Sequence, residues 1–276
     1  MTLVLVGTPI GNLGDLSPRA VDALRRADAI CCEDTRRTGR LLQHAGLERT
    51  PLLVVNDHTE VAAIPAVLQR LAAGERVAVV TDAGMPGVSD PGERLVRAAV
   101  AAGHAVEVVP GPSAAISALV ASGLPTGRWV FEGFLPRKGS GRTERLREVA
   151  VDPRTVVLYE APHRLARTLA DLAAACGAER RVAVARELTK LHEQLWRGTL
   201  GGAVAWTEAV PPRGEIVIVL DGAPAPEAAT ADELEDAVRA RLAAGDTPKD
   251  AATNVARTLG VPKRAAYEVA TRLRPR

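Results

Sequence analysis

The first 112 residues alternate short apolar runs with helix-like segments. The apolar runs lie at 3–6, 29–32, 52–55, 77–80 and 105–109. Ser17 and Pro18 are typical of a helix cap and first turn before 20–27, and further helices are expected over 64–73 and 94–102. This alternation predicts parallel strands joined by crossover helices.

The pattern changes after residue 129. Longer apolar runs follow at 129–135, 155–159, 181–185 and 215–220, with a helix expected over 163–176. These features predict a second α/β domain. The Pro- and Ala-rich segment 223–231 (APAPEAATA) is typical of a semi-rigid linker.

The residues after the linker predict a small helical unit. Helices are expected over 232–244 and 247–259, with a last helix from Pro262 after the turn at Gly260 and Val261. Two short helices across a glycine turn indicate a helix-turn-helix, although small three-helix caps share this pattern. We therefore predict α/β domains at 1–112 and 113–222, a linker at 223–231 and an all-α unit at 232–276.

Three loops rich in Gly and Pro each follow an expected strand and precede an expected helix. They read GTPIGNLG (7–14), TDAGMPGVSDPG (81–92) and PGPS (110–113). One such loop is equally well explained as a tight surface turn. If the three preceding strands are parallel neighbours, however, the loops meet at one edge of the sheet and line one crevice, where open α/β sheets bind ligands.

Composition narrows the class of protein. The three cysteines, Cys31, Cys32 and Cys176, offer neither a disulfide framework nor the spacing of a metal site, which favours a reducing cytoplasm and no bound metal. The opening MTLVLVG lacks a basic leader, and no run approaches the roughly 18 apolar residues of a membrane span. Export and membrane insertion are not expected.

Positive charge gathers at the carboxyl end. Residues 247–276 hold seven Lys and Arg against two acids, a net charge of +5, whereas the rest of the chain holds 28 basic against 31 acidic residues. Affinity for a polyanion is therefore expected in this tail, with a solvated helix face as the alternative.

The acidic residues of the loops bear on the ligand. There is no GxGxxG fingerprint or GxxxxGK[ST] phosphate loop, so a dinucleotide or triphosphate site is not supported. Carboxylates near the loops, at Glu33, Asp34, Asp57, Asp82 and Asp90, suit a cationic or hydroxyl-rich ligand better. S-adenosylmethionine, with its positive sulfonium, is one such ligand among several.

Seven sequence motifs together resemble those of one known protein family. In chain order they are GTPIGNLGDLSPRA, EDTRRTGRLL, TDAGMPGVSDPG, EVVPGPSA, FEGFLPRK, YEAPHR and RELTKLHE. Their order and spacing resemble the bacterial 16S ribosomal RNA cytidine 2′-O-ribose methyltransferases of the tetrapyrrole-methylase-like (class III) superfamily. The resemblance spans nearly the whole chain, including the carboxyl-terminal helix-turn-helix.

The resemblance implies two α/β domains with S-adenosylmethionine in the cleft between them, in a homodimer that methylates a decoding-region cytidine and so tunes the ribosomal P site. The residues implied at the donor site are Pro9, Asp82, Ala83, Gly84, Ser89, Asp90, Ser113, Ala114, Ala185 and Gly214. The basic loop 137–142 and the last unit are implied to hold RNA. The residues expected to do so are Arg36, Arg137, Lys138, Arg142, Lys249, Lys263 and Arg264.

Methyl transfer to a ribose hydroxyl needs in-line positioning and an acceptor for the hydroxyl proton. The candidate acceptors are Glu33, Asp34, Asp57, His58, Glu160, His163 and Lys190. The sequence does not choose among them, and we carry Glu33, Asp34 and Lys190 forward as catalytic candidates. Glu33 and Asp34 have a structural alternative as partners of Arg36 or Arg37.

Two segments depart from the family pattern, and two other functions compete. The departures are 56–60 (NDHTE) and 85–87 (MPG), which bear on substrate contacts and on loop packing. A small-molecule methylase acting on a tetrapyrrole would share the fold, but the basic tail argues against it. A ligand-sensing DNA regulator would explain the tail but leaves GTPIGNL and EDTR without a role.

Overall fold

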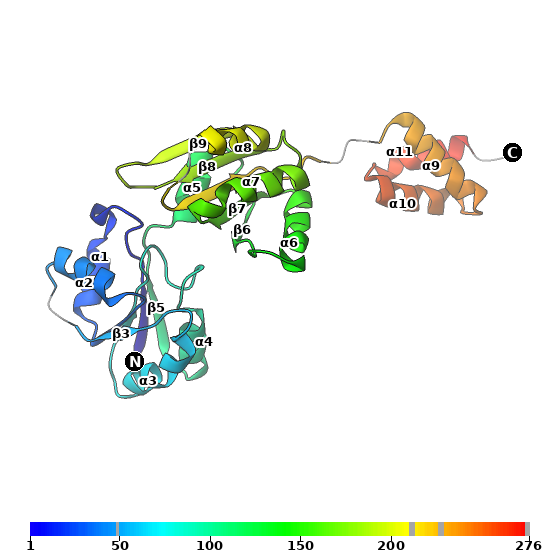
Figure 1. The fold of residues 1–276 in the computed structure, drawn as a ribbon. Helices are drawn as coiled ribbons and strands as arrows, with labels where there is room; N and C mark the ends of the chain where they lie inside the picture. Colours follow the sequence, from blue (N-terminus) through cyan, green and yellow to red (C-terminus); the bar gives the residue numbers. More distant parts are fainter. Residues whose placement is uncertain (48–49, 210–212, 226–228, 274–276) are drawn as a thin grey trace. The chain divides into compact units, whose positions relative to one another are not determined.

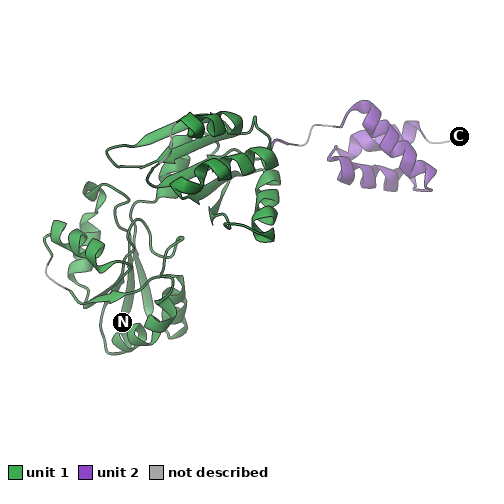
Figure 2. Ribbon diagram, in the orientation of Figure 1, with its two compact units in different colours: residues 1–223 green, residues 224–276 purple. Residues whose placement is uncertain are grey.

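A computed structural model of the chain describes residues 1–47, 50–209, 213–225 and 229–273 (Figure 1). The described residues divide into two compact units, which we call the amino-terminal unit (Met1–Ala223) and the helical unit (Pro224–Arg276) (Figure 2). The division falls in the segment that the sequence predicts as a linker, whose residues 226–228 lie outside the described ones. The boundary at 112/113 stays a prediction, since both sheets belong to one unit.

The first sheet contains five parallel strands in the order β3-β2-β4-β1-β5. The strands are β1 (Thr2–Val6), β2 (Ala29–Cys32), β3 (Leu52–Val54), β4 (Val77–Val79) and β5 (Ala105–Val109). β1 pairs with both β4 and β5, with Leu3 opposite Val77 and Val106. The strands that precede the three Gly/Pro loops are therefore neighbours, as the converging-loop interpretation requires.

Helices cover both faces of this sheet. They are α1 (Pro18–Arg25), α2 (Thr35–His44), α3 (Glu60–Ala72) and α4 (Glu93–Ala101), with a 3-10 turn, η1, at Leu13–Asp15. One core packs Leu24 of α1 and Leu41 of α2 against the sheet, and another packs Leu71 of α3 and Leu95 of α4. The predicted cap is confirmed, because the Ser17 hydroxyl accepts the Ala20 N–H at 3.1 Å.

The second sheet is mixed, in the order β6-β7-β10-β8-β9. Its strands are β6 (Trp129–Phe134), β7 (Thr155–Glu160), β8 (Arg181–Arg186), β9 (Gln194–Thr199) and β10 (Ile216–Leu220). β6 and β7 pair in parallel, β10 pairs antiparallel with both β7 and β8, and β8 pairs antiparallel with β9. Helix α5 (Ala114–Ser122) packs on one face, and α6 (Ser140–Val151), α7 (Pro162–Cys176) and α8 (Leu200–Ala209) pack on the other.

The helical unit consists of α9 (Ala231–Ala243), α10 (Pro248–Leu259) and α11 (Lys263–Arg272) around its own small core. Thr247 caps α10, since its hydroxyl accepts the Asp250 N–H at 3.2 Å, and Gly260 ends that helix with φ +65°. The expected helices on either side of a glycine turn are therefore confirmed. Among the described residues, no helix is both long and apolar enough to cross a membrane.

Candidate active site

The three Gly/Pro loops interlock at the carboxyl ends of β4, β1 and β5. Gly7 N–H donates at 2.9 Å to the carbonyl of Val109, the last residue of β5, which ties the first loop to the strand end from which the third loop starts. Thr8 and Gly84 exchange backbone hydrogen bonds of 2.9 and 3.2 Å, which tie the first loop to the second. The loops therefore form one rigid edge, and not three independent turns.

Glycine is required where two of these loops touch. A Cβ atom on Gly7 would lie 2.6 Å from the Gly111 Cα, and one on Gly111 would lie 2.7 Å from the Gly7 carbonyl carbon. Both obstacles are backbone atoms, which cannot rotate away as a side chain can. These two residues let the loops approach closely enough to share one cavity.

The loop at 81–92 is fixed by its backbone and by a buried acid. Gly84 and Gly87 take φ +87° and +81°, and Ser89 takes φ +62°, a conformation uncommon for a residue with a side chain. At the end of the loop, the buried Glu60 of α3 accepts the N–H groups of Gly92 and Arg94 at 2.9 and 3.0 Å. No pattern in the sequence predicts this role of Glu60.

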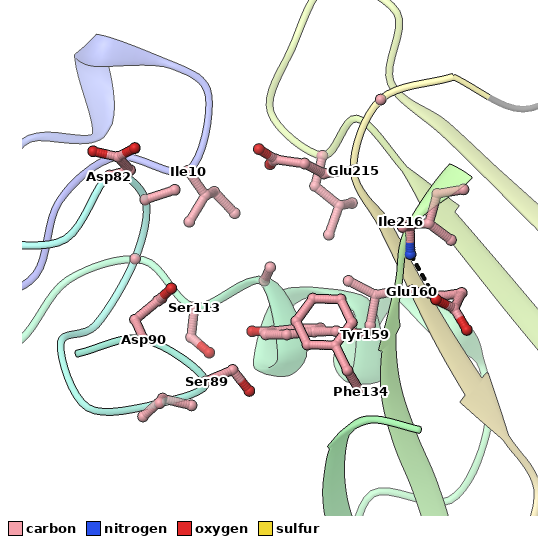
Figure 3. Close-up of a pocket in the computed structure, with 18 of the residues that line it drawn as sticks. Ile10, Asp82, Ser89, Asp90, Ser113, Phe134, Tyr159, Glu160, Glu215 and Ile216 are labelled. Carbon is pink, nitrogen blue, oxygen red and sulfur yellow. Dashed lines mark hydrogen bonds between the residues drawn. The ribbon is translucent and has the colours of Figure 1, made fainter. Parts of the chain in front are cut away.

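These loops and the second sheet enclose a cavity of about 370 Å³, which we call the central cavity (Figure 3). Its lining comprises Ile10, Arg37, Asp82, Ala83, Gly84, Met85, Val88, Ser89, Asp90, Ser113, Ala114, Phe134, Tyr159, Glu160, Ala161, Pro162, Leu188, Gly214, Glu215, Ile216 and Val217. A cavity of this size suits a small ligand or cofactor.

Eight of the ten residues expected at a donor site line this cavity. They are Asp82, Ala83, Gly84, Ser89, Asp90, Ser113, Ala114 and Gly214. Pro9 does not line it, although its neighbour Ile10 does. Ala185 does not line it either, because its methyl group is fully buried in the core between β8 and α5.

The cavity also has an apolar wall that the sequence does not predict. Phe134 and Tyr159 face it from the ends of β6 and β7, with ring centroids 5.7 Å apart in an edge-on arrangement. Their motifs, FEGFLPRK and YEAPHR, are noted in the sequence, but no pattern in the chain assigns them to a ligand site. Aromatic faces of this kind suit a flat ring.

Carboxylates make the loop side of the cavity acidic. Burial, reinforced by the charges of Glu33, Asp57 and Asp82, raises the pKa of Asp90 to about 7. Burial likewise raises the pKa of Glu33, against the hydrogen bond that its Oε1 accepts from the Asp82 N–H at 2.9 Å. Carboxylates that resist ionisation in this way favour a positively charged ligand.

Asp82 offers a further test of fit. Its Oδ2 lies 3.4 Å from the Arg37 Nε, whereas its buried Oδ1 has no hydrogen-bond partner among the described residues. An unpaired buried oxygen of this kind is costly unless a ligand donates to it. The hydroxyl or ammonium donors of S-adenosylmethionine would satisfy it, so the residues present fit that group.

The three catalytic candidates lie in different environments. The Asp34 carboxylate accepts the Arg36 N–H at 2.8 Å and caps α2, which lowers its pKa. Burial alone would lower the pKa of Lys190, but its hydrogen bond to Glu187 and the charge of Glu215 outweigh that effect and raise it. Of the three, only Glu33 has an environment that favours accepting a proton.

The loop that holds Lys190 joins both sides of the site. Lys190 Nζ lies 2.8 Å from Glu187 and 3.2 Å from Glu215, and its stem lies against Gly11. Glu187 takes φ +51°, and its carboxylate packs onto Gly214, where a side chain would clash. Lys190 thus has a structural role that the sequence did not indicate.

The expected basic loop at 137–142 is wrong at its end, because helix α6 begins at Ser140. Arg142 lies in α6 and not in a basic loop, and it is only 4% exposed. Its guanidinium donates to Asp171 at 2.7 and 2.9 Å and to the Pro136 carbonyl at 3.0 Å. Arg142 is therefore held by partners within the protein and does not extend from a mobile loop.

The other expected RNA contacts are exposed. Arg137 and Lys138 lie between β6 and α6, and Arg36 lies on α2 with 88% of its side chain exposed. In the helical unit, the exposed residues are Lys249 on α10 and Lys263 and Arg264 on α11. Arg264 also bonds Glu268 one turn along α11 at 2.9 Å.

Residues 2–204 match the family of tetrapyrrole (corrin/porphyrin) methylases. The chain is similar to proteins named ribosomal RNA small subunit methyltransferase I, including the following two. The protein from Synechocystis sp. is 46% identical over 98% of both chains. The protein from Thermotoga maritima is 45% identical over 220 residues, which make up 98% of that protein and 80% of this chain.

A solved structure shows the same fold. The uroporphyrin-III C-methyltransferase of Thermus thermophilus, in a complex with S-adenyl homocysteine, is 19% identical with a TM-score of 0.56. The match covers 80% of this chain and 96% of that one. At this identity the likeness extends to the fold of the two sheets only.

Proposed function

The chain belongs to the tetrapyrrole methylase family and, within it, groups with the ribosomal RNA small subunit methyltransferases I, and we propose that it methylates 16S ribosomal RNA with S-adenosylmethionine as the donor. The finer proposal is that it modifies the ribose 2′-oxygen of a decoding-region cytidine at the P site. The choice of the ribose 2′-oxygen and of this cytidine rests on the family resemblance of the seven motifs in the sequence.

The observation that carries the proposal is the acidic central cavity at the three interlocked loops. S-adenosylmethionine, when bound, supplies a methyl group made electrophilic by a positive sulfur. Asp90 and Asp82 would favour that charge, and Asp82 Oδ1 would accept one of the hydrogen-bond donors of the ligand. The rings of Phe134 and Tyr159 would pack on the adenine.

The reaction needs an acceptor for one proton. The ribose oxygen attacks the methyl carbon as the carbon–sulfur bond breaks, its electron pair passes to sulfur, and the hydroxyl proton must leave. We propose Glu33 as the acceptor, because burial raises its pKa and because it contacts the Asp82 backbone at the cavity.

Glu33→Gln tests that role, since the amide oxygen can still accept the Asp82 N–H. If Glu33 accepts the proton, kcat falls about 10²- to 10⁴-fold while the donor Kd stays within a few-fold. Asp34→Asn and Lys190→Gln serve as comparisons, and each should lower kcat by less than about tenfold. Equal losses in all three variants would contradict the assignment.

The function itself is tested by incubating the protein with labelled S-adenosylmethionine and small ribosomal subunits that lack the modification, then identifying the product nucleoside by mass spectrometry. A 2′-O-methylated cytidine is the expected product. Methylation of another nucleoside would keep the ribosomal RNA enzyme and overturn the finer proposal. Donor binding without transfer to subunits or free rRNA would favour a tetrapyrrole-type substrate, and no donor binding would favour the regulator.

The proposal includes a homodimer that works in the cytoplasm, as the resemblance implies. Sedimentation of the purified chain at micromolar concentration tests whether it is a homodimer. A single species at the monomer mass of 29.0 kDa would overturn it.

A further inference from the structure

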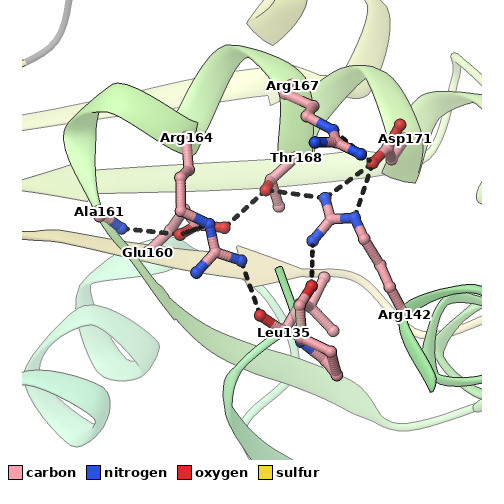
Figure 4. Close-up of polar contacts among 9 residues, drawn as sticks. Leu135, Arg142, Glu160, Ala161, Arg164, Arg167, Thr168 and Asp171 are labelled. Carbon is pink, nitrogen blue, oxygen red and sulfur yellow. Dashed lines mark hydrogen bonds and ion pairs between the residues drawn. The ribbon is translucent and has the colours of Figure 1, made fainter. Parts of the chain in front are cut away.

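A second cavity, of about 240 Å³, lies beside helix α7 and is lined mostly by cationic side chains. Figure 4 shows the polar contacts of Arg142, Arg164 and Arg167, three of these side chains. We call this cavity the basic pocket. Its lining comprises Arg137, Arg142, His163, Arg164, Arg167 and Thr168. None of these residues has a role in holding a donor in the central cavity.

Two inner arginines are held rigidly. Arg142, with a side chain 5% exposed, is tied to Asp171, and its Nη2 also donates to the Thr168 hydroxyl at 3.1 Å. Arg164 lies 3.2 Å from the fully buried Glu160 carboxylate and donates to the Leu135 carbonyl at 2.7 Å. Their positions are therefore set before any ligand arrives.

The outer side chains are not held in the same way. Arg137 and His163 are exposed, and neither has a hydrogen bond or ion pair to the residues that the structure describes. Arg167 is 66% exposed and lies 3.8 Å from Asp171, which Arg142 already occupies. These three side chains are free to turn toward an anion.

The charges of the pocket do not balance. Four guanidinium groups face two carboxylates, Glu160 and Asp171, which leaves two positive charges from the arginines. Guanidinium forks match the oxygens of a phosphate, and their weak hydration favours this use. The pocket is therefore built for a phosphate-sized anion.

The basic pocket adjoins the central cavity at the start of α7. Ala161 and Pro162 line the central cavity, and His163 and Arg164, the next two residues, line the basic pocket. A nucleic acid chain with one ribose at the central cavity would bring a neighbouring phosphate to this junction. We propose that the basic pocket binds a backbone phosphodiester of the substrate RNA next to the methylated nucleotide, an inference that rests on the proposed function.

The double variant Arg137→Gln/Arg167→Gln tests the pocket without touching the buried Arg142. With unmodified small subunits as substrate, KM should rise about tenfold or more, while kcat and the donor Kd stay within about twofold. The dependence of log KM on log salt should become shallower by about one unit, because the contacts to one phosphate are weakened. Arg147→Gln is the matched control, since Arg147 is exposed on α6 outside the pocket.

The outcomes separate this inference from the proposed function. Transfer by the wild type, with the same KM and salt slope in the double variant as in Arg147→Gln, would overturn the pocket alone. No transfer by the wild type to subunits or free rRNA would overturn both. If millimolar inorganic phosphate raises the melting temperature of the wild type but not of the double variant, and KM for RNA is unchanged, the pocket serves a free anion and the inference is wrong.

Discussion

The two carboxylate oxygens of Asp82 have different surroundings, so a role in ligand binding can be distinguished from a role in folding. Its Oδ2 takes part in an exposed pair with Arg37, and its buried Oδ1 is unpaired among the described residues. Asp82→Ala should therefore weaken S-adenosylmethionine binding about 10- to 100-fold, the value of a lost hydrogen bond to a charged group. Removal of an unsatisfied oxygen and one exposed ion pair should change the unfolding free energy by less than about 1 kcal/mol.

Calorimetric titration and urea unfolding of the same samples measure the two quantities. Asp22→Ala is the control, because Asp22 lies on the exposed face of α1, where it pairs with Arg25. A loss of stability that matches the loss of affinity would show that Asp82 supports the loop and not the ligand.

Asp90 predicts a pH-dependent affinity. Its pKa of about 7 in the folded protein, set by burial and by neighbouring carboxylates, means that it is mostly neutral at pH 6 and mostly ionised at pH 8. Its negative form attracts a cation, so the Kd for S-adenosylmethionine should fall by up to about tenfold from pH 6 to pH 8. S-adenosylhomocysteine, whose sulfur is neutral, should show a clearly smaller change.

The same shift predicts a stability effect of definite sign. Because the folded pKa lies above the unfolded value, the folded state holds the proton more tightly, and stability should fall as pH rises from about 4 to about 7. Asp90→Asn should flatten the stability profile over this window and reduce the pH dependence of donor affinity. Parallel profiles in variant and wild type would rule out Asp90 as the titrating group.

At the scale of elements, the contact between the loops after β1 and β5 controls the shape of the site. Gly7→Ala places a methyl group 2.6 Å from the Gly111 Cα, and the backbone must move to accept it. We expect a loss of about 1 to 3 kcal/mol of unfolding free energy, as for other overpacked sites, together with weaker donor binding.

Gly39→Ala is the matched control for this change. A Cβ at Gly39, in the middle of α2, meets nothing within 4 Å. Removing a helical glycine should there stabilise the protein by about 0.5 to 1 kcal/mol in urea unfolding. Equal effects of the two alanines would show that the loop contact is not the constraint.

The sequence predicts those elements whose pattern is local. The parallel strands and the three loops follow from apolar runs and from Gly and Pro, because both signals act within a few residues. Strand β9 (QLWRGT) and helix α6 (SGRTERLREVAV) carry weak apolar patterns and were missed. Long-range pairings were also hidden: nothing near Arg142 in the chain indicates that Asp171 would bury it.

Prediction of the site from the sequence is limited in the same way. Asp82 and Ser113 could be expected at the ligand because their loops follow neighbouring strands. The wall formed by Phe134 and Tyr159 depends on how a second sheet closes the cavity, which no local pattern encodes. Ala185 is the opposite case. The resemblance implies that it lies at the donor site, but its side chain points into the core.

For the molecule as a whole, the division of the chain into two units predicts that donor binding and RNA affinity are separable. All residues that line the central cavity lie between Ile10 and Val217, inside the amino-terminal unit, whose cores are separate from that of the helical unit. The Thermotoga maritima relative is matched almost end to end by 220 residues, close to the 223 residues of this unit. The helical unit, with exposed Lys249, Lys263 and Arg264, is expected to add affinity for RNA.

Deletion of residues 224–276 should therefore leave the melting temperature of the cavity-bearing unit and the donor Kd nearly unchanged. KM for small subunits should rise about 10- to 100-fold and lose part of its salt dependence, while kcat stays within about threefold. The full-length triple variant Lys249→Gln/Lys263→Gln/Arg264→Gln should reproduce most of this rise, because it removes the charge and keeps the helices. Full activity after deletion would instead assign RNA binding to the amino-terminal unit alone, whereas loss of donor binding would show that the helical unit supports the central cavity.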